Sequence, residues 1–183
     1  MGVPDSRAPF IAEEIDAVAK TFPHARVFVG DEATADRLAA YGPTSPFVHI
    51  ATHAQFRRDN PMFSSIRLGS GPFSVIDLYQ LRLSAELVTL SGCSTGLNAI
   101  VGGDELLGLV RGLLYAGASA VLLTLWDTHD MSAAAFMESF YRHLRTSPNK
   151  ARAIRLATLE IRERYPHPFY WAPFTLIGQA MPC

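Results

Sequence analysis

Residues Leu87–Gly96 read Leu-Val-Thr-Leu-Ser-Gly-Cys-Ser-Thr-Gly. Val88, Thr89 and Leu90 form an apolar, β-branched run that is too short for a helix and is followed closely by glycine. Such a run predicts a buried strand. Cys93 then falls on the turn that follows this strand.

A second stretch, Phe47–His53, has the same pattern, an apolar run that ends on a polar residue. In an open parallel sheet, residues at the carboxyl ends of neighbouring strands meet in one crevice, where ligands bind. The thiol of Cys93 and the imidazole of His53 would bring a nucleophile and a base together there. These two side chains are therefore the candidate catalytic pair.

The composition of the 183 residues indicates a globular protein, with 49% hydrophobic and 18% charged residues. This length allows one domain with a substantial core. A formal net charge of −1 and the lack of any basic run argue against nucleic acid or an anionic membrane as a partner. Two cysteines are too few for a disulfide framework and suit a reducing compartment. With neither a signal pattern nor a membrane-spanning apolar run, we expect a cytoplasmic protein.

Outward from the two strands, hydrophobic periodicity predicts strands that alternate with helices. This order is typical of an α/β domain with a mainly parallel sheet flanked by helices. Residues 55–72 are expected to form a long polar loop beside the site. We find no repeat or linker, so residues 1–183 are expected to form a single domain. The expected strands are residues 27–29, 47–53, 88–90, 118–125 and 174–177, and the expected helices are residues 11–22, 33–41, 75–81, 104–116, 131–144 and 151–165.

Taken alone, a buried cysteine is more often a small hydrophobic residue than a nucleophile. The position of Cys93 at a strand end, among small residues such as Gly92 and Gly96, favours catalysis because a substrate backbone can approach closely. Motifs for phosphate binding, dinucleotide binding or a serine nucleophile are absent from the sequence. His49 and His53 are spaced so that both could face one side of a strand and bind a metal. Further ligands are not evident, so His49 is better interpreted as a packed strand histidine.

Five motifs in register over about residues 10–180 make the chain similar to CHAT domains. These are caspase- and separase-like cysteine peptidases of clan CD, often attached to tetratricopeptide repeats in bacteria. The matching motifs are His49–Ala54, Leu90–Gly96, Tyr115–Ala118, Leu125–Asp130 and Trp171–Phe174.

The resemblance implies a caspase-like three-layer sandwich and a cysteine endopeptidase that needs no metal or organic cofactor. It also implies that His53 is the catalytic histidine and Cys93 the nucleophile. The backbone N–H groups of Cys93 and Ala54 would hold the oxyanion. Two residues depart from the family pattern: Ala54 stands where caspases have glycine, and Gly92 stands where alanine is commoner.

Specificity is implied by Trp126–Asp130, which is similar to the Trp-Asp-x-x-Asp stretch of separases. By that resemblance Asp127 or Asp130 would bind a basic P1 side chain. Asp130 is equally suited to be the N-cap of the following helix, which would leave Asp127 for the substrate. An acidic P1 preference would instead need arginines, and only Arg57 and Arg58 lie near His53 in the sequence. That alternative is less favoured.

Two further functional classes remain open. The chain could be a latent or inactive CHAT signalling module that needs an activating partner or a tetratricopeptide-repeat sensor region, as the C-terminal part of a larger protein. Alternatively, the same pair could act on small-molecule thioesters or amides. The segment between Cys93 and Ala118 is short and mostly helical, so a peptidase of this kind is expected to act as a single, uncut chain on a protein or peptide substrate.

Overall fold

The computed structural model describes residues 1–6, 8–57, 59–92, 104–126 and 128–181. Its centre is a sheet in the order β1 (Phe47–Ala51), β5 (Leu87–Ser91), β6 (Ala120–Thr124) and β7 (Phe174–Gly178). The first three strands are parallel to their neighbours, and β7 runs antiparallel to β6. This arrangement confirms the predicted mainly parallel sheet.

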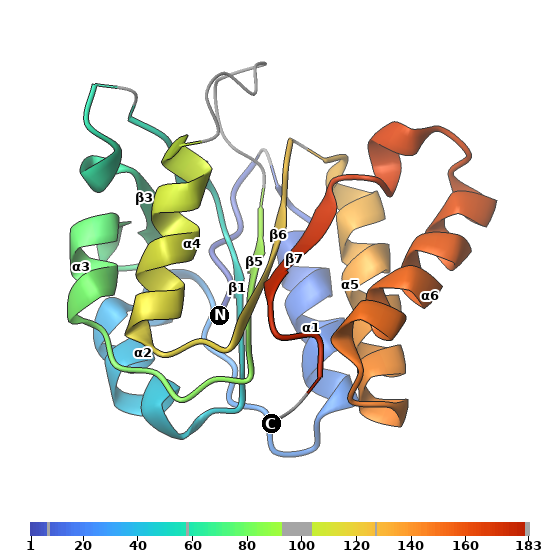
Figure 1. Cartoon of the computed structure of the whole chain (residues 1–183), viewed down its shortest axis with the longest axis horizontal. Helices are drawn as coiled ribbons and strands as arrows, with labels where there is room; N and C mark the ends of the chain where they lie inside the picture. Colours follow the sequence, from blue (N-terminus) through green and yellow to red (C-terminus); the bar gives the residue numbers. More distant parts are fainter. Residues whose placement is uncertain (7, 58, 93–103, 127, 182–183) are drawn as a thin grey trace.

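Helices cover both faces of the sheet and complete a three-layer sandwich (Figure 1). One layer contains α2 (Ala35–Tyr41), α3 (Val75–Gln80) and α4 (Asp104–Ala116), and the other contains α1 (Ile11–Thr21), α5 (Asp130–Thr146) and α6 (Lys150–Arg164). All six helices were predicted, with ends that differ by a few residues. None of the helices in the described ranges is long and apolar enough to cross a bilayer.

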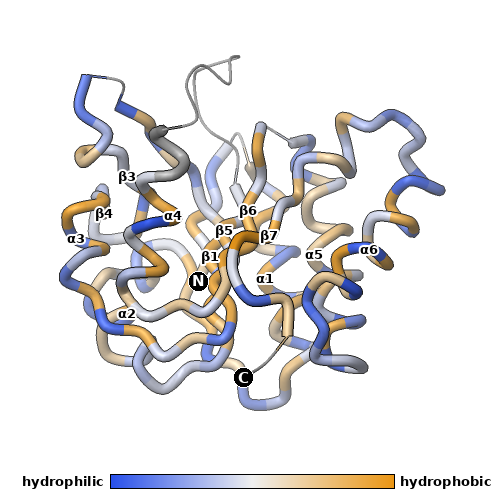
Figure 2. The backbone as a smooth tube through the Cα atoms, in the orientation of Figure 1, coloured by the Kyte–Doolittle hydropathy of each residue, from blue (hydrophilic) through white to orange (hydrophobic). Residues whose placement is uncertain are grey.

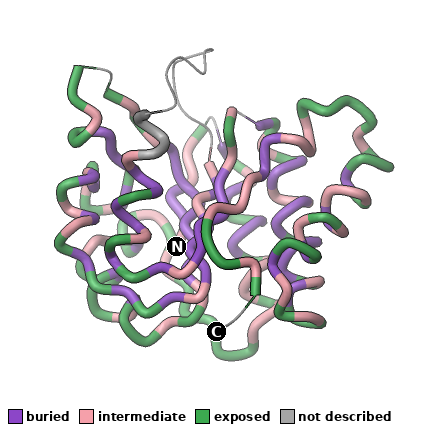
Figure 3. The backbone as a smooth tube through the Cα atoms, viewed as in Figure 1, coloured by how far each residue is buried: buried purple, intermediate pink, exposed green. Residues whose placement is uncertain are grey.

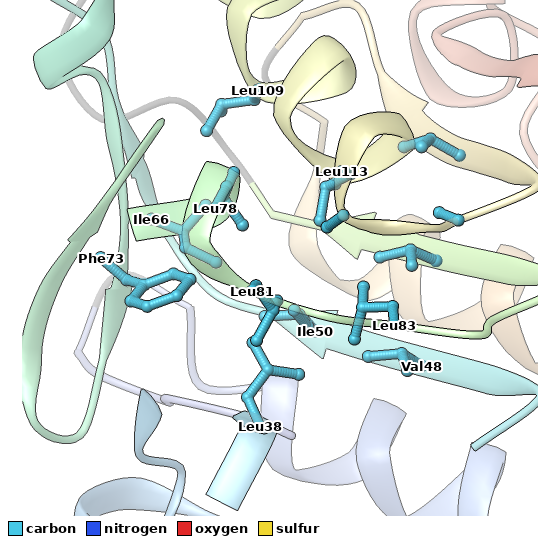
Figure 4. Close-up of a cluster of buried hydrophobic side chains, with 14 of the residues drawn as sticks. Leu38, Val48, Ile50, Ile66, Phe73, Leu78, Leu81, Leu83, Leu109 and Leu113 are labelled. Atoms are coloured by element: carbon cyan, nitrogen blue, oxygen red, sulfur yellow. The ribbon is translucent and has the colours of Figure 1, made fainter. Parts of the chain in front are cut away.

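Two apolar clusters hold the layers together because alternate residues of each strand face opposite sides of the sheet. Val121 and Leu123 of β6 join the cluster beneath α3 and α4, whereas Ala120 and Leu122 join the cluster beneath α5 and α6. β1, β5 and β6 are accordingly mostly apolar and mostly buried, whereas most of β7 is half-buried (Figures 2 and 3). Figure 4 shows the first cluster, with side chains contributed by α2, the sheet, α3 and α4.

The expected loop over residues 55–72 was wrong in large part. It contains most of a small antiparallel sheet formed by β2 (Ala54–Gln55), β3 (Ser65–Leu68) and β4 (Gly71–Ser74). The strands are short, and their few apolar side chains are separated by polar residues, so the overall composition looked like a loop. Those apolar side chains point into the core that β3 and β4 share with α3 and α4.

The expected strand at residues 27–29 was also wrong. Val29 makes a single parallel bridge to Gly2, and Val27 is exposed. Gly2 also bridges Ala51, so the amino-terminal residues lie beside β1 and extend the sheet edge. Backbone hydrogen bonds from Val3 N–H to Ala51 (3.0 Å) and from Gly2 N–H to Phe28 (2.9 Å) hold this segment in place.

Candidate active site

His53 is fixed by backbone contacts just beyond the end of β1. The preceding residue, Thr52, donates its N–H to Ser91 O of β5 at 2.8 Å. The carbonyl of His53 accepts the N–H of Arg67 in β3 at 2.9 Å. The imidazole is buried, with a side-chain exposure of only 8%. His53 is therefore held between the main sheet and the small sheet.

The carboxyl ends of β1, β5 and β6 meet at Gly92. A Cβ added to Gly92 would lie 1.6 Å from the Thr52 carbonyl oxygen, so the two backbones touch here. From the other side, Thr124 Oγ1 at the end of β6 donates to Gly92 O at 3.1 Å. The residues that precede His53 and Cys93 in sequence are thus in contact. Cys93 itself and Asp127 lie outside the described residues.

The structure adds a carboxylate that the sequence analysis missed. Asp5 Oδ1 lies 3.1 Å from His53 Nε2, and Asp5 Oδ2 lies 3.1 Å from Nη1 of Arg67. No sequence signal marks Asp5, because it is 48 positions from His53 and sits in a segment without periodicity. The parallel bridge between Gly2 and Ala51 brings it to the end of β1.

Ala54, the expected second oxyanion donor, is the first residue of β2 and pairs with Ile66 of β3. Because Arg67 N–H donates to the carbonyl of His53, Ala54 and Ile66 form a non-hydrogen-bonded pair. The N–H of Ala54 is therefore directed away from β3. Its role as an oxyanion donor stays a prediction with which this direction is compatible.

The interpretation of Asp130 as an N-cap was wrong. The N-cap of α5 is His129, without a side-chain cap, and Asp130 is the first helical residue. Its Oδ2 instead accepts the N–H of Phe10, just before α1, at 2.8 Å. Burial raises the pKa of the Asp130 carboxyl, although the hydrogen bond from Phe10 partly lowers it. The Asp130 carboxylate therefore accepts from the N–H of a residue distant in sequence rather than from an N–H at the start of its own helix.

His49 is a packed strand histidine, as the sequence favoured. Its Nδ1 lies 3.2 Å from the hydroxyl of Tyr141, and its Nε2 lies 2.9 Å from Glu14. The Tyr141 hydroxyl also contacts Thr89 Oγ1 at 2.7 Å, and burial raises the pKa of this phenol. His49 therefore belongs to a buried polar network of β1, β5, α1 and α5.

The arginines near His53 are divided between two roles. Arg57, considered for an acidic P1 preference, forms an exposed ion pair with Asp59. Arg58 lies outside the described residues. Arg67, which the sequence analysis did not single out, is the arginine that reaches the Asp5 carboxylate beside His53. Arg57 and Arg67 thus each form an ion pair with a carboxylate, Asp59 and Asp5 respectively.

Residues 2–179 match the family model described as "CHAT domain". Tetratricopeptide repeat protein 28 from mouse is 38% identical over 106 residues, and its human counterpart is 33% identical over 104 residues. Each match covers 56% of this chain but only 4% of the relative. Both relatives are mammalian, so a bacterial origin, which the resemblance to CHAT domains suggests for this chain, stays a prediction.

A solved structure shows the same fold at low sequence identity. The Arg-specific cysteine proteinase gingipain R (RGPB) matches with a TM-score of 0.66 and 14% identity, over 96% of this chain and 42% of its own. The architecture of this chain is a caspase-like three-layer sandwich, the fold of a class of cysteine proteases. With a family model that spans almost all of its length, the chain belongs to the CHAT domain family.

Proposed function

We propose that this chain is a cysteine endopeptidase that cleaves peptide bonds with Cys93 as nucleophile and His53 as general base. The observation that carries the proposal is the backbone contact between Gly92 and Thr52, the residues that precede the two reacting groups. The residues that precede Cys93 and His53 in the sequence therefore lie in contact at the carboxyl ends of two neighbouring parallel strands. Membership in the CHAT family supports the same assignment.

The proposed reaction uses only groups of the chain and water. A cysteine thiol ordinarily has a pKa of about 8.5, so His53 takes the Sγ proton as the sulfur attacks the peptide carbonyl carbon. The protonated imidazole then gives that proton to the leaving amine as the C–N bond breaks, leaving a thioester. Water attacks the thioester while His53 accepts a water proton. The C–S bond breaks, the peptide acid leaves and the thiol is restored.

The backbone N–H groups of Cys93 and Ala54 would stabilise the oxyanion formed in both steps. A donor of this kind contributes about 3–4 kcal/mol of transition-state stabilisation in enzymes where it has been removed. The direction of the Ala54 N–H, away from β3, supports its part in this proposal. Alanine in place of the caspase glycine does not remove the donor, because the N–H belongs to the backbone.

We propose a basic P1 preference for this site, with Asp127 as the main candidate carboxylate and Asp130 as the second. Carboxylates bind guanidinium and ammonium groups through charge-assisted hydrogen bonds. Asp130 is half-buried, and one of its oxygens accepts the Phe10 N–H. Its neighbour at position 127 is therefore the better candidate. The structural neighbour gingipain R is described as Arg-specific.

The alternative is a latent or inactive CHAT module that responds to a partner. It is favoured by the curated relatives, which are tetratricopeptide repeat proteins and are far longer than the region they share with this chain. In this alternative an activating partner or a repeat region orders the site before cleavage. Residues 1–183 would act as one CHAT domain of the cytoplasm in either case.

The test is covalent labelling with acyloxymethyl-ketone peptides carrying P1 Arg, P1 Leu or P1 Asp, followed by peptide mapping. We expect the P1 Arg probe to label Cys93, labelling to be lost in Cys93→Ala and greatly slowed in His53→Ala. Cys183→Ala and His24→Ala are matched controls for the other thiol and for an exposed histidine. An unlabelled wild-type protein with all three probes would contradict a constitutively active peptidase and favour the latent module.

A further inference from the structure

The segment of residues 1–10, which had no periodicity in the sequence, connects three parts of the site. Gly2 bridges Ala51 at the end of β1, Asp5 contacts the buried ring of His53, and Phe10 donates its N–H to Asp130 at the start of α5. This segment therefore crosses the carboxyl ends of the strands between two fixed points, with one charged side chain directed at the imidazole.

The carboxylate of Asp5 is held on both oxygens. Oδ1 accepts from the N–H of Ala8 at 3.2 Å and contacts His53 Nε2 at 3.1 Å, while Oδ2 accepts from Nη1 of Arg67 at 3.1 Å. The Asp5 side chain is 21% exposed and that of Arg67 is 56% exposed. The arginine is thus the more exposed partner of a carboxylate whose other oxygen contacts the His53 ring.

We propose that Asp5 is a positioning residue that sets the tautomer and orientation of His53. This inference rests on the proposed role of His53 as the base. An ionised carboxylate only accepts hydrogen bonds, so the His53 nitrogen beside it, Nε2, carries the hydrogen. In a neutral imidazole this leaves Nδ1 unprotonated and able to take the proton of the thiol. After that transfer the imidazolium carries its positive charge next to Asp5, which stabilises it.

The same geometry gives Arg67 an indirect role. Its guanidinium donates to Oδ2 of Asp5 and helps to hold the carboxylate whose Oδ1 contacts His53. Asp130 anchors the far end of the segment through Phe10. The reactivity of Cys93 therefore depends on the contacts that Gly2, Asp5 and Phe10 make beside the strand ends.

The chain contains a matched control for this arrangement. Glu160 joins a histidine and an arginine in the same way, contacting His143 Nε2 at 2.7 Å and Arg142 on the outer side of α5 and α6. The change Glu160→Ala removes the same kind of contact far from the strand ends. The melting temperature of Glu160→Ala therefore shows how far the loss of such a carboxylate destabilises the fold without any effect on His53.

The first measurement is the ring tautomer of His53, determined by ¹⁵N NMR on protein labelled at histidine. The His53 signals are assigned from their absence in the spectrum of His53→Gln. We expect wild type to show the hydrogen on Nε2, and Asp5→Ala to show a mixture of the two neutral forms. Arg67→Ala, which keeps the contact between Asp5 and His53, is expected to retain the Nε2 form. Glu160→Ala is expected to leave the His53 signals unchanged.

The second measurement separates chemistry from binding in the labelling reaction. Loss of a residue that orients a metal-bound histidine typically lowers metal affinity or activity by about 10–100-fold, and we expect an effect of that size here. We expect Asp5→Ala to lower the maximal labelling rate by that factor for P1 Arg and P1 Leu probes alike, with unchanged probe affinity. A smaller decrease is expected for Arg67→Ala. Melting temperatures of all variants confirm that they are folded.

Three results would overturn the inference. One is a wild-type ring with the hydrogen on Nδ1, and another is an unchanged tautomer in folded Asp5→Ala. The third is a loss of affinity in Asp5→Ala that is confined to the P1 Arg probe, which would make Asp5 a substrate-binding residue. If no probe labels wild type, the peptidase proposal fails, yet the NMR measurement still decides the role of Asp5.

Discussion

The contact of Gly92 with Thr52 makes a sharp prediction for Gly92→Ala. The added Cβ would lie 1.6 Å from the Thr52 carbonyl oxygen, with the Thr52 carbonyl carbon 2.7 Å away. Carbon and oxygen atoms in such contacts ordinarily stay at least about 3.3 Å apart, so the shortfall is roughly 1.7 Å. Both obstructing atoms belong to the backbone, so no side-chain rotation relieves the overlap. The ends of β1 and β5 must separate.

The cost follows from that separation. Overpacking of an interior typically costs about 1–3 kcal/mol, and a displacement of sheet backbone lies at the upper end of this range. We expect a loss of about 3 kcal/mol in the free energy of unfolding. In a chain of this size that corresponds to a decrease of about 6–12 °C in the melting temperature. Labelling of Cys93 should slow as well, because the displaced strand end precedes the nucleophile.

The assay is thermal and urea unfolding, with Gly108→Ala as the matched control. A Cβ on Gly108 in α4 would have Pro61 O and Val75 Cγ2 at 3.8 Å, an ordinary van der Waals contact. Alanine in place of a helical glycine should stabilise by about 0.5–1 kcal/mol. Opposite signs for the two glycine-to-alanine changes are therefore expected. Equal melting temperatures for Gly92→Ala and wild type would refute the close approach of the strand ends.

Three further changes test other parts of the structure. Tyr141→Phe removes the hydroxyl that contacts Thr89 and His49 in the buried network, and should cost about 1–3 kcal/mol in urea unfolding because buried polar groups lose a partner; a neutral effect would contradict that network. Ser74→Ala breaks the capping box of α3 and should lower the free energy of unfolding in urea by about 1 kcal/mol. An unchanged free energy of unfolding would contradict a stabilising cap at this position. Burial raises the pKa of the Glu160 carboxyl, but hydrogen bonds from its neighbours outweigh burial and lower it to about 2. The stabilisation by ionised Glu160 should therefore be present above the ordinary glutamate pKa and be lost as the pH falls towards 2. Glu160→Gln should accordingly lower the melting temperature at pH 7 but make little difference at pH 2. An equal effect at both pH values would refute the lowered pKa of Glu160.

Much of the scaffold could be predicted because its signals are local. The apolar run of β6 and the periodic apolar faces of the helices arise from neighbours in sequence, and the Ser74 cap needs only the three residues that follow it. The pairing of β1 with β5 was also predictable, because buried strands joined by helices form parallel sheets. The small sheet of β2, β3 and β4 was missed because only the few residues of its strands that face the core are apolar, and the residues between them are polar, glycine or proline.

The candidate site was predicted in part. His53 could be recognised because it ends a buried strand and matches a family motif. The destination of Asp130 could not be predicted, since a helix-cap pattern and a distant N–H donor compete for the same carboxylate and only packing decides between them. Arg67 looked like one of many surface arginines until the register of β3 placed it beside the strand ends.

Residue types and their spacing were enough to predict the alternation of strands and helices, the positions of His53 and Cys93 after two apolar runs, and the family resemblance. All of these depend on residue type and spacing along the chain. The contacts of Asp5 with His53 and Arg67 became visible only in the folded chain, because Asp5 and His53 are 48 positions apart in the sequence. The folded chain also explains the glycine at position 92, because a methyl group there would overlap the backbone carbonyl of Thr52, just after β1. Long-range approach of this kind depends on how the sheet register and the packing of the layers place the backbone, which no local pattern specifies.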